Sequence, residues 1–172
     1  MTGCFQIYTG NGKGKTTAAL GLALRAAGAG RRIFFGQFLK TAATGEAAAL
    51  RDRFADCLDL VQFGPGRFIR AAPEPGEIAQ ARRGLESLRA ALTGGRYHLV
   101  IGDEAVTAVR AGLFAEADLL ALADARPAAV ELLLTGRGAG PALIARADLV
   151  TDMREVKHYF TRGLPPRPGI EY

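Results

Sequence analysis

A glycine-rich stretch near the N-terminus holds the residue types that bind phosphate. It reads Tyr8-Thr9-Gly10-Asn11-Gly12-Lys13-Gly14-Lys15-Thr16-Thr17. Glycines let successive N–H groups turn towards an anion, a lysine adds a full positive charge, and a threonine hydroxyl can ligate Mg²⁺. An apolar run precedes the stretch and a helical pattern follows it, so we predict a P-loop rather than a glycine-rich turn with a chance lysine. The usual motif has glycine where this chain has Thr9.

Two acids that follow an apolar run form a second candidate site. The run Leu99-Val100-Ile101-Gly102 ends in Asp103-Glu104. An acid at the end of a buried strand that faces a P-loop can hold Mg²⁺ directly or through water. We therefore predict a metal site formed by Thr16, Asp103 and Glu104. Glu104 could instead be a hydrolytic base or an acceptor outside the metal's ligand shell.

Two basic residues stand at comparable positions. Lys40 follows the apolar run 32–39, and Arg137 lies between two glycines after the run 129–134. Flanking glycines permit a close backbone approach and a guanidinium suits phosphate, although a solvated surface arginine is the alternative. We predict that the nucleotide is bound by Thr9, Gly10, Asn11, Gly12, Lys13, Gly14, Lys15, Thr16, Thr17 and Arg137.

Strand-like and helix-like segments alternate along the chain. We predict strands at 4–8, 32–39, 58–63, 97–102, 129–134 and 149–153, and helices at about 15–27, 47–54, 77–92, 113–125 and 141–147. This alternation indicates an α/β fold, a P-loop (recombinase-like) parallel sheet of about six strands with helices on both faces. Ligands of such sheets bind beyond the carboxyl ends of the strands, where the polar residues named above fall.

Length and composition describe an ordinary globular protein. The 172 residues are 49% hydrophobic, with a net charge of +5 and a pI near 9.6. We predict one P-loop nucleotide-binding domain over 1–172, with a surface C-terminal tail from about residue 162. We expect neither export nor a membrane span, and Cys4 and Cys57 suit a reducing, cytoplasmic location. The basic excess fits a polyanion such as ATP better than nucleic acid, because aromatic and basic residues do not interleave.

The chain resembles the P-loop ATP:corrinoid adenosyltransferases, also called ATP:cob(I)alamin adenosyltransferases. The resemblance covers nearly the whole chain. It rests on the P-loop stretch, Gln37-Phe38-Leu39-Lys40, Asp103-Glu104, Thr135-Gly136-Arg137-Gly138, Ala147-Asp148-Leu149-Val150-Thr151, Lys157-His158 and the ending Gly169-Ile170-Glu171-Tyr172.

The resemblance implies a reaction in which Co(I) of a corrinoid attacks the 5′ carbon of ATP and triphosphate leaves, in cobalamin biosynthesis or salvage. Lys15, Glu104 and Arg137 would be the catalytic residues. Lys13, Lys15, Thr16 and Arg137 would stabilise the triphosphate, and Thr16 with Asp103 or Glu104 would hold Mg²⁺. Cobalt is the nucleophile, which agrees with Ser87 being the only serine.

The irregular stretch 64–76 departs from the family pattern. The family commonly carries Phe-x-Trp there, whereas this chain has no tryptophan and reads Gly66-Arg67-Phe68-Ile69-Arg70. The stretch could be a functional loop or a simple connector. We expect the corrinoid to contact Phe68, Arg67 and Lys40. The resemblance also suggests a homodimer and a flavoprotein reductant.

Two other functions fit a P-loop. The chain could be an ATPase or kinase acting on another small substrate, which would release phosphate or ADP instead of triphosphate. It could also be a recombinase-like nucleic-acid ATPase, which would show turnover stimulated by DNA and steep salt dependence.

Overall fold

One six-stranded sheet forms the centre of the computed structural model, which describes residues 2–40, 44–64 and 72–171. All its strand pairs are parallel, and the order is β3-β2-β4-β5-β1-β6. The strands are β1 (Phe5–Thr9), β2 (Ile33–Gln37), β3 (Leu58–Gln62), β4 (Leu99–Asp103), β5 (Glu131–Thr135) and β6 (Leu149–Asp152). The predicted fold class is confirmed.

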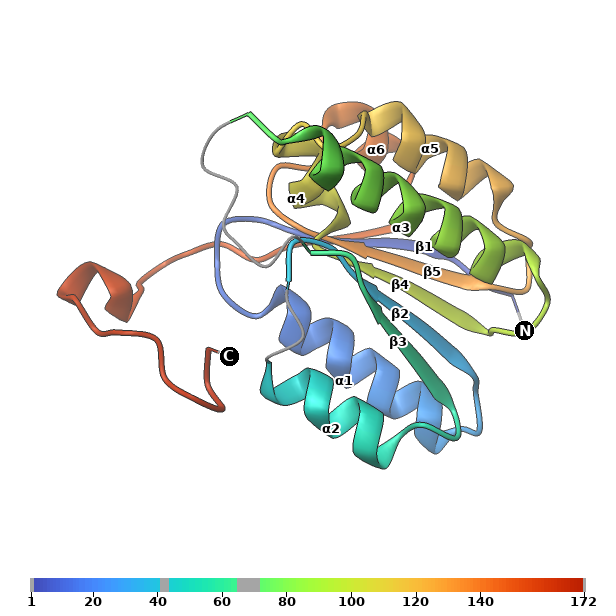
Figure 1. The fold of residues 1–172 in the computed structure, drawn as a ribbon, viewed down its shortest axis with the longest axis horizontal. Coiled ribbons are helices and arrows are strands. Elements are labelled where there is room, and N and C mark those ends of the chain that lie inside the picture. The colour runs from blue at the N-terminus through green and yellow to red at the C-terminus, as the bar shows by residue number, and fades with distance from the viewer. Residues whose placement is uncertain (1, 41–43, 65–71, 172) are drawn as a thin grey trace.

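Helices cover both faces of the sheet (Figure 1). On one face lie α1 (Lys15–Gly28) and α2 (Gly45–Arg53). On the other lie α3 (Pro75–Thr93), α4 (Ala105–Arg110), α5 (Glu116–Ala125) and α6 (Pro141–Arg146). Since β5 separates β1 from β4, the P-loop and Asp103 stand one strand apart at the carboxyl edge of the sheet.

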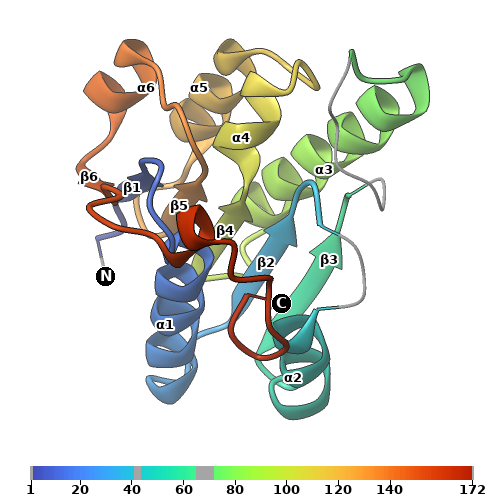
Figure 2. The ribbon, with the colours of Figure 1, turned by 90° about the vertical axis from the view of Figure 1, so that its left-hand side faces the viewer.

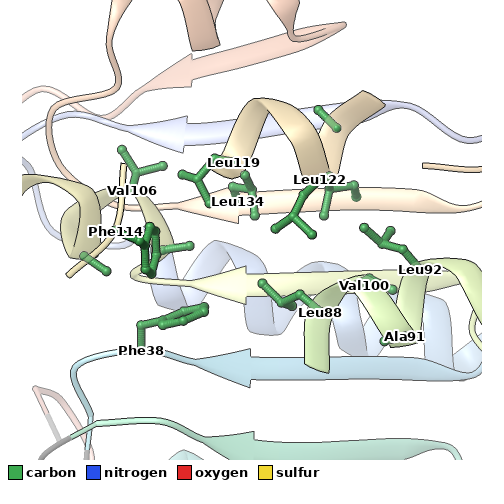
Figure 3. Close-up of a cluster of buried hydrophobic side chains, with 14 of the residues drawn as sticks. Phe38, Leu88, Ala91, Leu92, Val100, Val106, Phe114, Leu119, Leu122 and Leu134 are labelled. Carbon is green, nitrogen blue, oxygen red and sulfur yellow. The ribbon is translucent and has the colours of Figure 1, made fainter. Parts of the chain in front are cut away.

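The core divides into two layers because side chains alternate along each strand. Phe34 of β2 belongs to the cluster under α3–α6, whereas Ile33 and Phe35 pack under α1 and α2. Figure 3 shows part of the larger cluster, in which the Phe38 ring lies 5.4 Å from that of Phe114. Both faces of β2 are buried, which explains its nearly continuous apolar sequence.

Several predicted boundaries shift, and one helix was missed. The predicted strand 32–39 ends at Gln37, because Leu39 adopts a left-handed conformation with φ of 61°. The predicted helix 113–125 begins at Glu116. Leu113 and Phe114 lie in the bend before this helix, and their side chains are buried in the core. Their apolar character therefore reflects burial and does not indicate a helix. The six-residue α4 was not predicted because it is too short to show a helical period.

The C-terminal segment leaves the sheet after β6 and returns to the P-loop (Figure 2). A 3-10 helix, η1 (Tyr159–Arg162), lies midway, and residues 161–170 are all exposed. The Ile170 carbonyl accepts a hydrogen bond from Lys13 Nζ at 3.0 Å. Glu171 binds the Tyr159 hydroxyl and Arg167, and these contacts lower the pKa of Glu171 to about 2, the Arg167 hydrogen bond being the largest cause.

Candidate nucleotide and metal site

The P-loop has the backbone that its glycines predict. Gly10 and Gly14 have φ of 95° and 116°, angles that other residues rarely adopt. Lys15 begins α1 and is only 6% exposed. Its Nζ donates to the carbonyls of Gly10 and Gly12, each at 2.7 Å. The lysine is therefore folded back over the loop in which a phosphate would sit.

The electrostatic setting of Lys15 favours an anionic ligand. Burial lowers the pKa of Lys15, and the Arg137 guanidinium adds to this effect, while Glu104 and Asp103 oppose it. A phosphate that replaces the two loop carbonyls would give the buried ammonium a full counter-charge.

The segment after β6 packs tightly against the P-loop, which the sequence did not reveal. The Gly12 N–H donates to the Met153 carbonyl at 2.7 Å, and the Met153 N–H donates to the Thr9 carbonyl at 2.9 Å. A Cβ on Gly12 would lie 2.6 Å from the Met153 oxygen, so glycine is needed there for a close approach. In this structure the Gly12 N–H is thus committed to protein, in contrast to the expected phosphate contact.

Thr9 stands where the usual P-loop motif has glycine, and its side chain contacts the loop after β5. Its side chain is buried, and its Oγ1 accepts a hydrogen bond from the Ala139 N–H at 3.3 Å. The threonine therefore ties the P-loop strand to the loop after β5.

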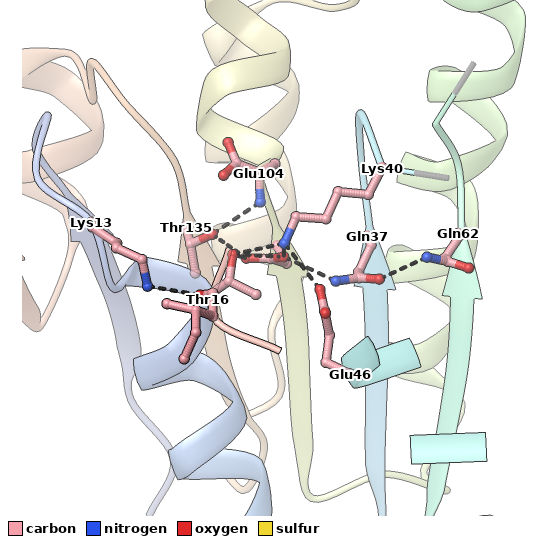
Figure 4. A network of polar contacts seen from close by, with 10 residues as sticks. Lys13, Thr16, Gln37, Lys40, Glu46, Gln62, Glu104 and Thr135 are labelled. Atoms are coloured by element: carbon pink, nitrogen blue, oxygen red, sulfur yellow. Dashed lines mark hydrogen bonds and ion pairs between the residues drawn. The ribbon is translucent and has the colours of Figure 1, made fainter. Parts of the chain in front are cut away.

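Asp103 is fully buried and is the centre of a polar network (Figure 4). Thr16 Oγ1 donates to it, at 3.0 Å from Oδ1 and 3.1 Å from Oδ2. Thr135 Oγ1 donates to Oδ1 at 2.7 Å, and Gln37 Nε2 donates to Oδ2 at 3.2 Å. These donors explain how a carboxylate is accommodated without exposure to water. Thr16 and Asp103 are thus in direct contact, and the metal site predicted from them stays a prediction.

Lys40 reaches into this network from the end of β2. Its Nζ lies 3.0 Å from Thr16 Oγ1, 3.2 Å from Asp103 Oδ2 and 3.4 Å from Glu46 Oε1. Burial lowers the pKa of Lys40, but Asp103 and Glu46 more than offset this, so the net shift is upward. The ammonium thus faces the predicted metal-binding oxygens, and contact with a corrinoid stays a prediction.

Glu104 has a strained backbone. Its φ and ψ are 60° and 13°, a left-handed conformation that costs a non-glycine residue about 1–2 kcal/mol. Its N–H donates to Thr135 Oγ1 at 2.9 Å. In Figure 4 its carboxylate points away from Thr16 and Glu46. Among the described residues, Leu39 is the other non-glycine residue with positive φ, so strain borders the network on two sides.

Arg137 is exposed on the loop after β5. Its N–H donates to Thr107 Oγ1 at 2.9 Å. Gly136 has φ of 144°, and a Cβ there would lie 2.4 Å from the Thr107 nitrogen. Gly136 thus permits a close backbone approach to α4, and the predicted approach to a phosphate stays a prediction. The Arg137 guanidinium is near enough to Lys15 to affect its pKa.

A cavity of about 510 Å³ lies between the P-loop and the end of β6, and Asp103 is not among its lining residues. This volume is sufficient for part of a nucleotide. Its walls come from the P-loop, the loop after β5, α6 and the segment after β6, represented by Asn11, Ala139, Ile144 and Arg154.

The remaining predicted site residues fall into two groups. Asn11, Lys13 and Thr17 are exposed at the P-loop. Phe68 and Arg67 lie outside the described residues. The loop that carries them nevertheless starts beside the network, because a Cβ on Gly64 would lie 2.0 Å from the Lys40 carbonyl oxygen.

Three residues of the network were not assigned a role from the sequence. Thr135 and Gln37 stand at the carboxyl ends of apolar runs, the signal that identified Asp103, and could have been found by it. Glu46 lies in the first turn of α2 and gives no comparable signal. Ser87, the only serine of the sequence, lies on α3 and donates to the Arg83 carbonyl at 2.8 Å.

The donor set suits Mg²⁺ better than a softer metal. No group of three or more His, Cys, Asp or Glu side chains that could hold an ion occurs within residues 2–40, 44–64 and 72–171. Mg²⁺ needs few protein ligands because it keeps several waters and shares phosphate oxygens. The Thr16 hydroxyl and the Asp103 carboxylate are oxygen ligands of this kind. The Lys40 ammonium binds the same two groups, so they already hold one cation.

Two further observations concern the molecule's environment. Within the described part of the chain, no helix has the length and apolar character needed to span a bilayer. Cys4 and Cys57 are both free thiols.

Comparison with known proteins gives consistent results. All of residues 1–172 match the family described as ATP:corrinoid adenosyltransferase BtuR/CobO/CobP. The corrinoid adenosyltransferase of Pseudomonas aeruginosa is 36% identical over 171 residues, which cover 99% of this chain and 84% of the relative. Those of Sinorhizobium sp. and Escherichia coli K12 are 32% and 30% identical, covering 99% of this chain and 80% and 86% of the relatives.

Proposed function

The chain belongs to the ATP:corrinoid adenosyltransferase family, and from this premise we propose how its own residues transfer the 5′-deoxyadenosyl group of ATP to the Co(I) centre of a corrinoid. Cobalt supplies an electron pair to the 5′ carbon, a cobalt–carbon bond forms, and the bond from that carbon to oxygen breaks. The electron pair of the broken bond leaves with triphosphate. No proton transfer is required, so the protein needs neither a base nor a nucleophile for this step.

The P-loop stabilises the leaving group. Negative charge develops on the departing oxygen, and cations placed beforehand around it lower the barrier without further rearrangement. Lys15 is buried and centred on the loop, while Lys13 and Arg137 flank it from exposed positions. We assign triphosphate binding to these three residues, to the N–H groups of the loop other than that of Gly12, and to those at the start of α1.

Thr16 and Asp103 hold Mg²⁺ in this proposal. When bound, the ion neutralises phosphate charge and so helps triphosphate to leave. Thr16 contributes a hydroxyl oxygen. Asp103 already accepts from Thr16, Thr135 and Gln37, which favours an outer position from which it orients Thr16 and water. Glu104, turned away from Thr16, is a second candidate that orients water.

The corrinoid is assigned to the loop after β3, with Phe68, Arg67 and Lys40 as contacts. A flat, largely apolar macrocycle needs an apolar wall, which an aromatic ring supplies without adding a ligand to cobalt. The closeness of Gly64 to Lys40 supports this assignment, since it places the start of the loop at the same edge as the nucleotide site.

The assembly and location are also proposals. We propose that residues 1–172 act as one nucleotide-binding domain, that two copies form a homodimer, and that a flavoprotein supplies the reducing electron. The partly exposed apolar residues Leu149 and Val150 on edge strand β6 support a contact between copies. The free thiols of Cys4 and Cys57 support a reducing, cytoplasmic location.

The observation that carries the proposal is the contact between Thr16 and Asp103 next to a P-loop that holds the buried Lys15, in a chain that matches this family over its full length. The test supplies ATP, Mg²⁺ and chemically reduced corrinoid to the protein. We expect a light-labile alkylcobalt spectrum and one triphosphate per adenosyl group transferred. Formation of ADP or phosphate without an alkylcobalt product would instead indicate an ATPase or kinase.

A further inference from the structure

The ammonium of Lys40 lies among the oxygens assigned to the metal. Three oxygens surround Nζ at 3.0–3.4 Å, from the Thr16 hydroxyl, the Asp103 carboxylate and the Glu46 carboxylate. The side chains of Lys40 and Glu46 are only 24% and 19% exposed, and Asp103 is fully buried. The contact is therefore part of the interior and differs from a surface ion pair.

The directions of the hydrogen bonds at Thr16 Oγ1 show which of its atoms the Lys40 ammonium contacts. Thr16 Oγ1 gives its single hydrogen to Asp103 and accepts a hydrogen from Lys40. A hydroxyl that ligates a metal uses its lone pair and keeps its hydrogen for another acceptor. The Lys40 ammonium thus occupies one of the two lone pairs of Thr16 Oγ1 and also contacts Asp103 Oδ2, so a metal ion at these oxygens would meet its positive charge.

The backbone directs Lys40 to this position. Phe38 is anchored in the core against Phe114, and Leu39, which follows it, has a left-handed conformation with φ of 61°. The Lys40 backbone is fixed in turn by its close contact with Gly64. What remains free to move is the four-carbon side chain, which can withdraw from Thr16 without any change in the fold.

We propose that Lys40 is a resident cation of the metal site, which excludes free divalent metal from Thr16 and Asp103 until a nucleotide draws the ammonium away. This rests on the proposed function, because it takes Mg²⁺ and the triphosphate of ATP as the ligands. An ammonium and Mg²⁺ cannot share the site, since like charges a few ångströms apart repel strongly in the interior. A triphosphate offers Lys40 new anionic partners, so metal enters together with ATP rather than before it.

The proposal is tested by metal binding without corrinoid. Free Mn²⁺ is titrated into nucleotide-free protein and counted by electron paramagnetic resonance. We expect wild type to bind Mn²⁺ weakly and Lys40→Met, which keeps an unbranched side chain one atom shorter but loses the charge, to bind at least tenfold more tightly. Lys157→Met removes the charge of an exposed lysine and should match wild type. Lys40→Arg keeps the charge and should still exclude the ion.

A double variant locates the ion. Adding Thr16→Val to Lys40→Met should abolish the gained Mn²⁺ affinity, because it removes the ligand that Lys40 had covered. Equal Mn²⁺ affinity in wild type and Lys40→Met would overturn the proposal, as would tight binding that survives Thr16→Val. If Lys40→Met does not fold, Lys40→Gln provides a shorter, neutral side chain that removes the charge, and the same outcomes apply.

A thermal measurement gives an independent readout. Mg²⁺ without nucleotide should raise the melting temperature of Lys40→Met and leave that of wild type unchanged, because only the variant has an unfilled cation site. A rise of equal size in both proteins would overturn the proposal. Neither experiment uses corrinoid, so failure of adenosyl transfer would count against the proposed function and leave these results standing.

Discussion

Thr135→Val should destabilise the protein although it barely changes the shape of the side chain. Thr135 is fully buried, and its hydroxyl makes two hydrogen bonds. It donates to Asp103 Oδ1 at 2.7 Å and accepts from the Glu104 N–H at 2.9 Å. Valine replaces the hydroxyl by a methyl group, which leaves a buried carboxylate short of one donor and a strained backbone N–H without its acceptor.

The size of the effect follows from these two bonds. A buried polar group that loses its partner costs about 1–3 kcal/mol, and more when the group is charged. Asp103 keeps its bonds from Thr16 and Gln37, which limits its share. We expect a loss of about 2–4 kcal/mol in the free energy of unfolding, counted from these penalties. For a chain of this length that corresponds to a fall of about 4–16 °C in melting temperature.

Urea denaturation of the metal-free, nucleotide-free protein measures this loss, with Thr135→Ser as the matched control. Serine keeps the hydroxyl and removes one buried methyl group, at a cost of about 1 kcal/mol. The order of stability should therefore be wild type, Thr135→Ser, Thr135→Val. A valine variant as stable as the serine variant would refute the reasoning, because the hydroxyl would then contribute nothing to holding Asp103 and Glu104.

Four further outcomes are expected. Lys15→Ala should weaken ATP binding about 10- to 100-fold, the loss of one charge-assisted bond of about 1.5–3 kcal/mol, and calorimetry that finds unchanged affinity would contradict the P-loop assignment. Asp103→Asn should lower activity and raise the Mg²⁺ concentration needed for half-maximal rate; an unmoved magnesium titration would remove Asp103 from the metal site. Phe68→Ala should slow adenosylation most when the reaction starts from Co(II), whereas equal loss from Co(I) with a lower melting temperature would make Phe68 structural. Because its pKa is depressed to about 2, Glu171 should hold the tail fully above pH 4.5 and release it as the pH falls towards 2. An NMR titration should find that low pKa in wild type and a higher pKa in Arg167→Gln, because only the Tyr159 and backbone hydrogen bonds then remain, and identical values in both would refute the pairing.

Much of the nucleotide site could be predicted from local sequence. The P-loop is a contiguous strand, turn and helix, so its geometry depends on residues that are neighbours in the chain. Gly10 and Gly14 adopt the positive φ that their type allows, and Lys15 begins the helix as expected. Asp103 was placed beside Thr16 by a general rule, since all strands of a parallel sheet end at one edge.

The rest of the site depends on contacts between segments far apart in the chain. Lys40 and Glu46 meet over Asp103 because strand order brings β2 beside β4 and α2 packs near its end. The strand β6 lies beside β1, and this pairing sets Met153 against Gly12. Neither pairing is written in a local pattern, because each follows from the order in which six similar apolar strands assemble.

The sequence by itself determined the chemistry that this protein can hold, namely a phosphate-binding loop, an acid at a strand end and the cations around them. Only the tertiary structure decided which of these groups touch in the nucleotide-free protein. The covalent structure of a glycine, a lysine or a threonine determines what it can bind, whereas the packing of the fold determines which group it actually contacts. Lys40 is such a case. The sequence suggested it as a contact for the corrinoid, whereas in the structure its ammonium binds the oxygens of Thr16 and Asp103 that we propose for the metal.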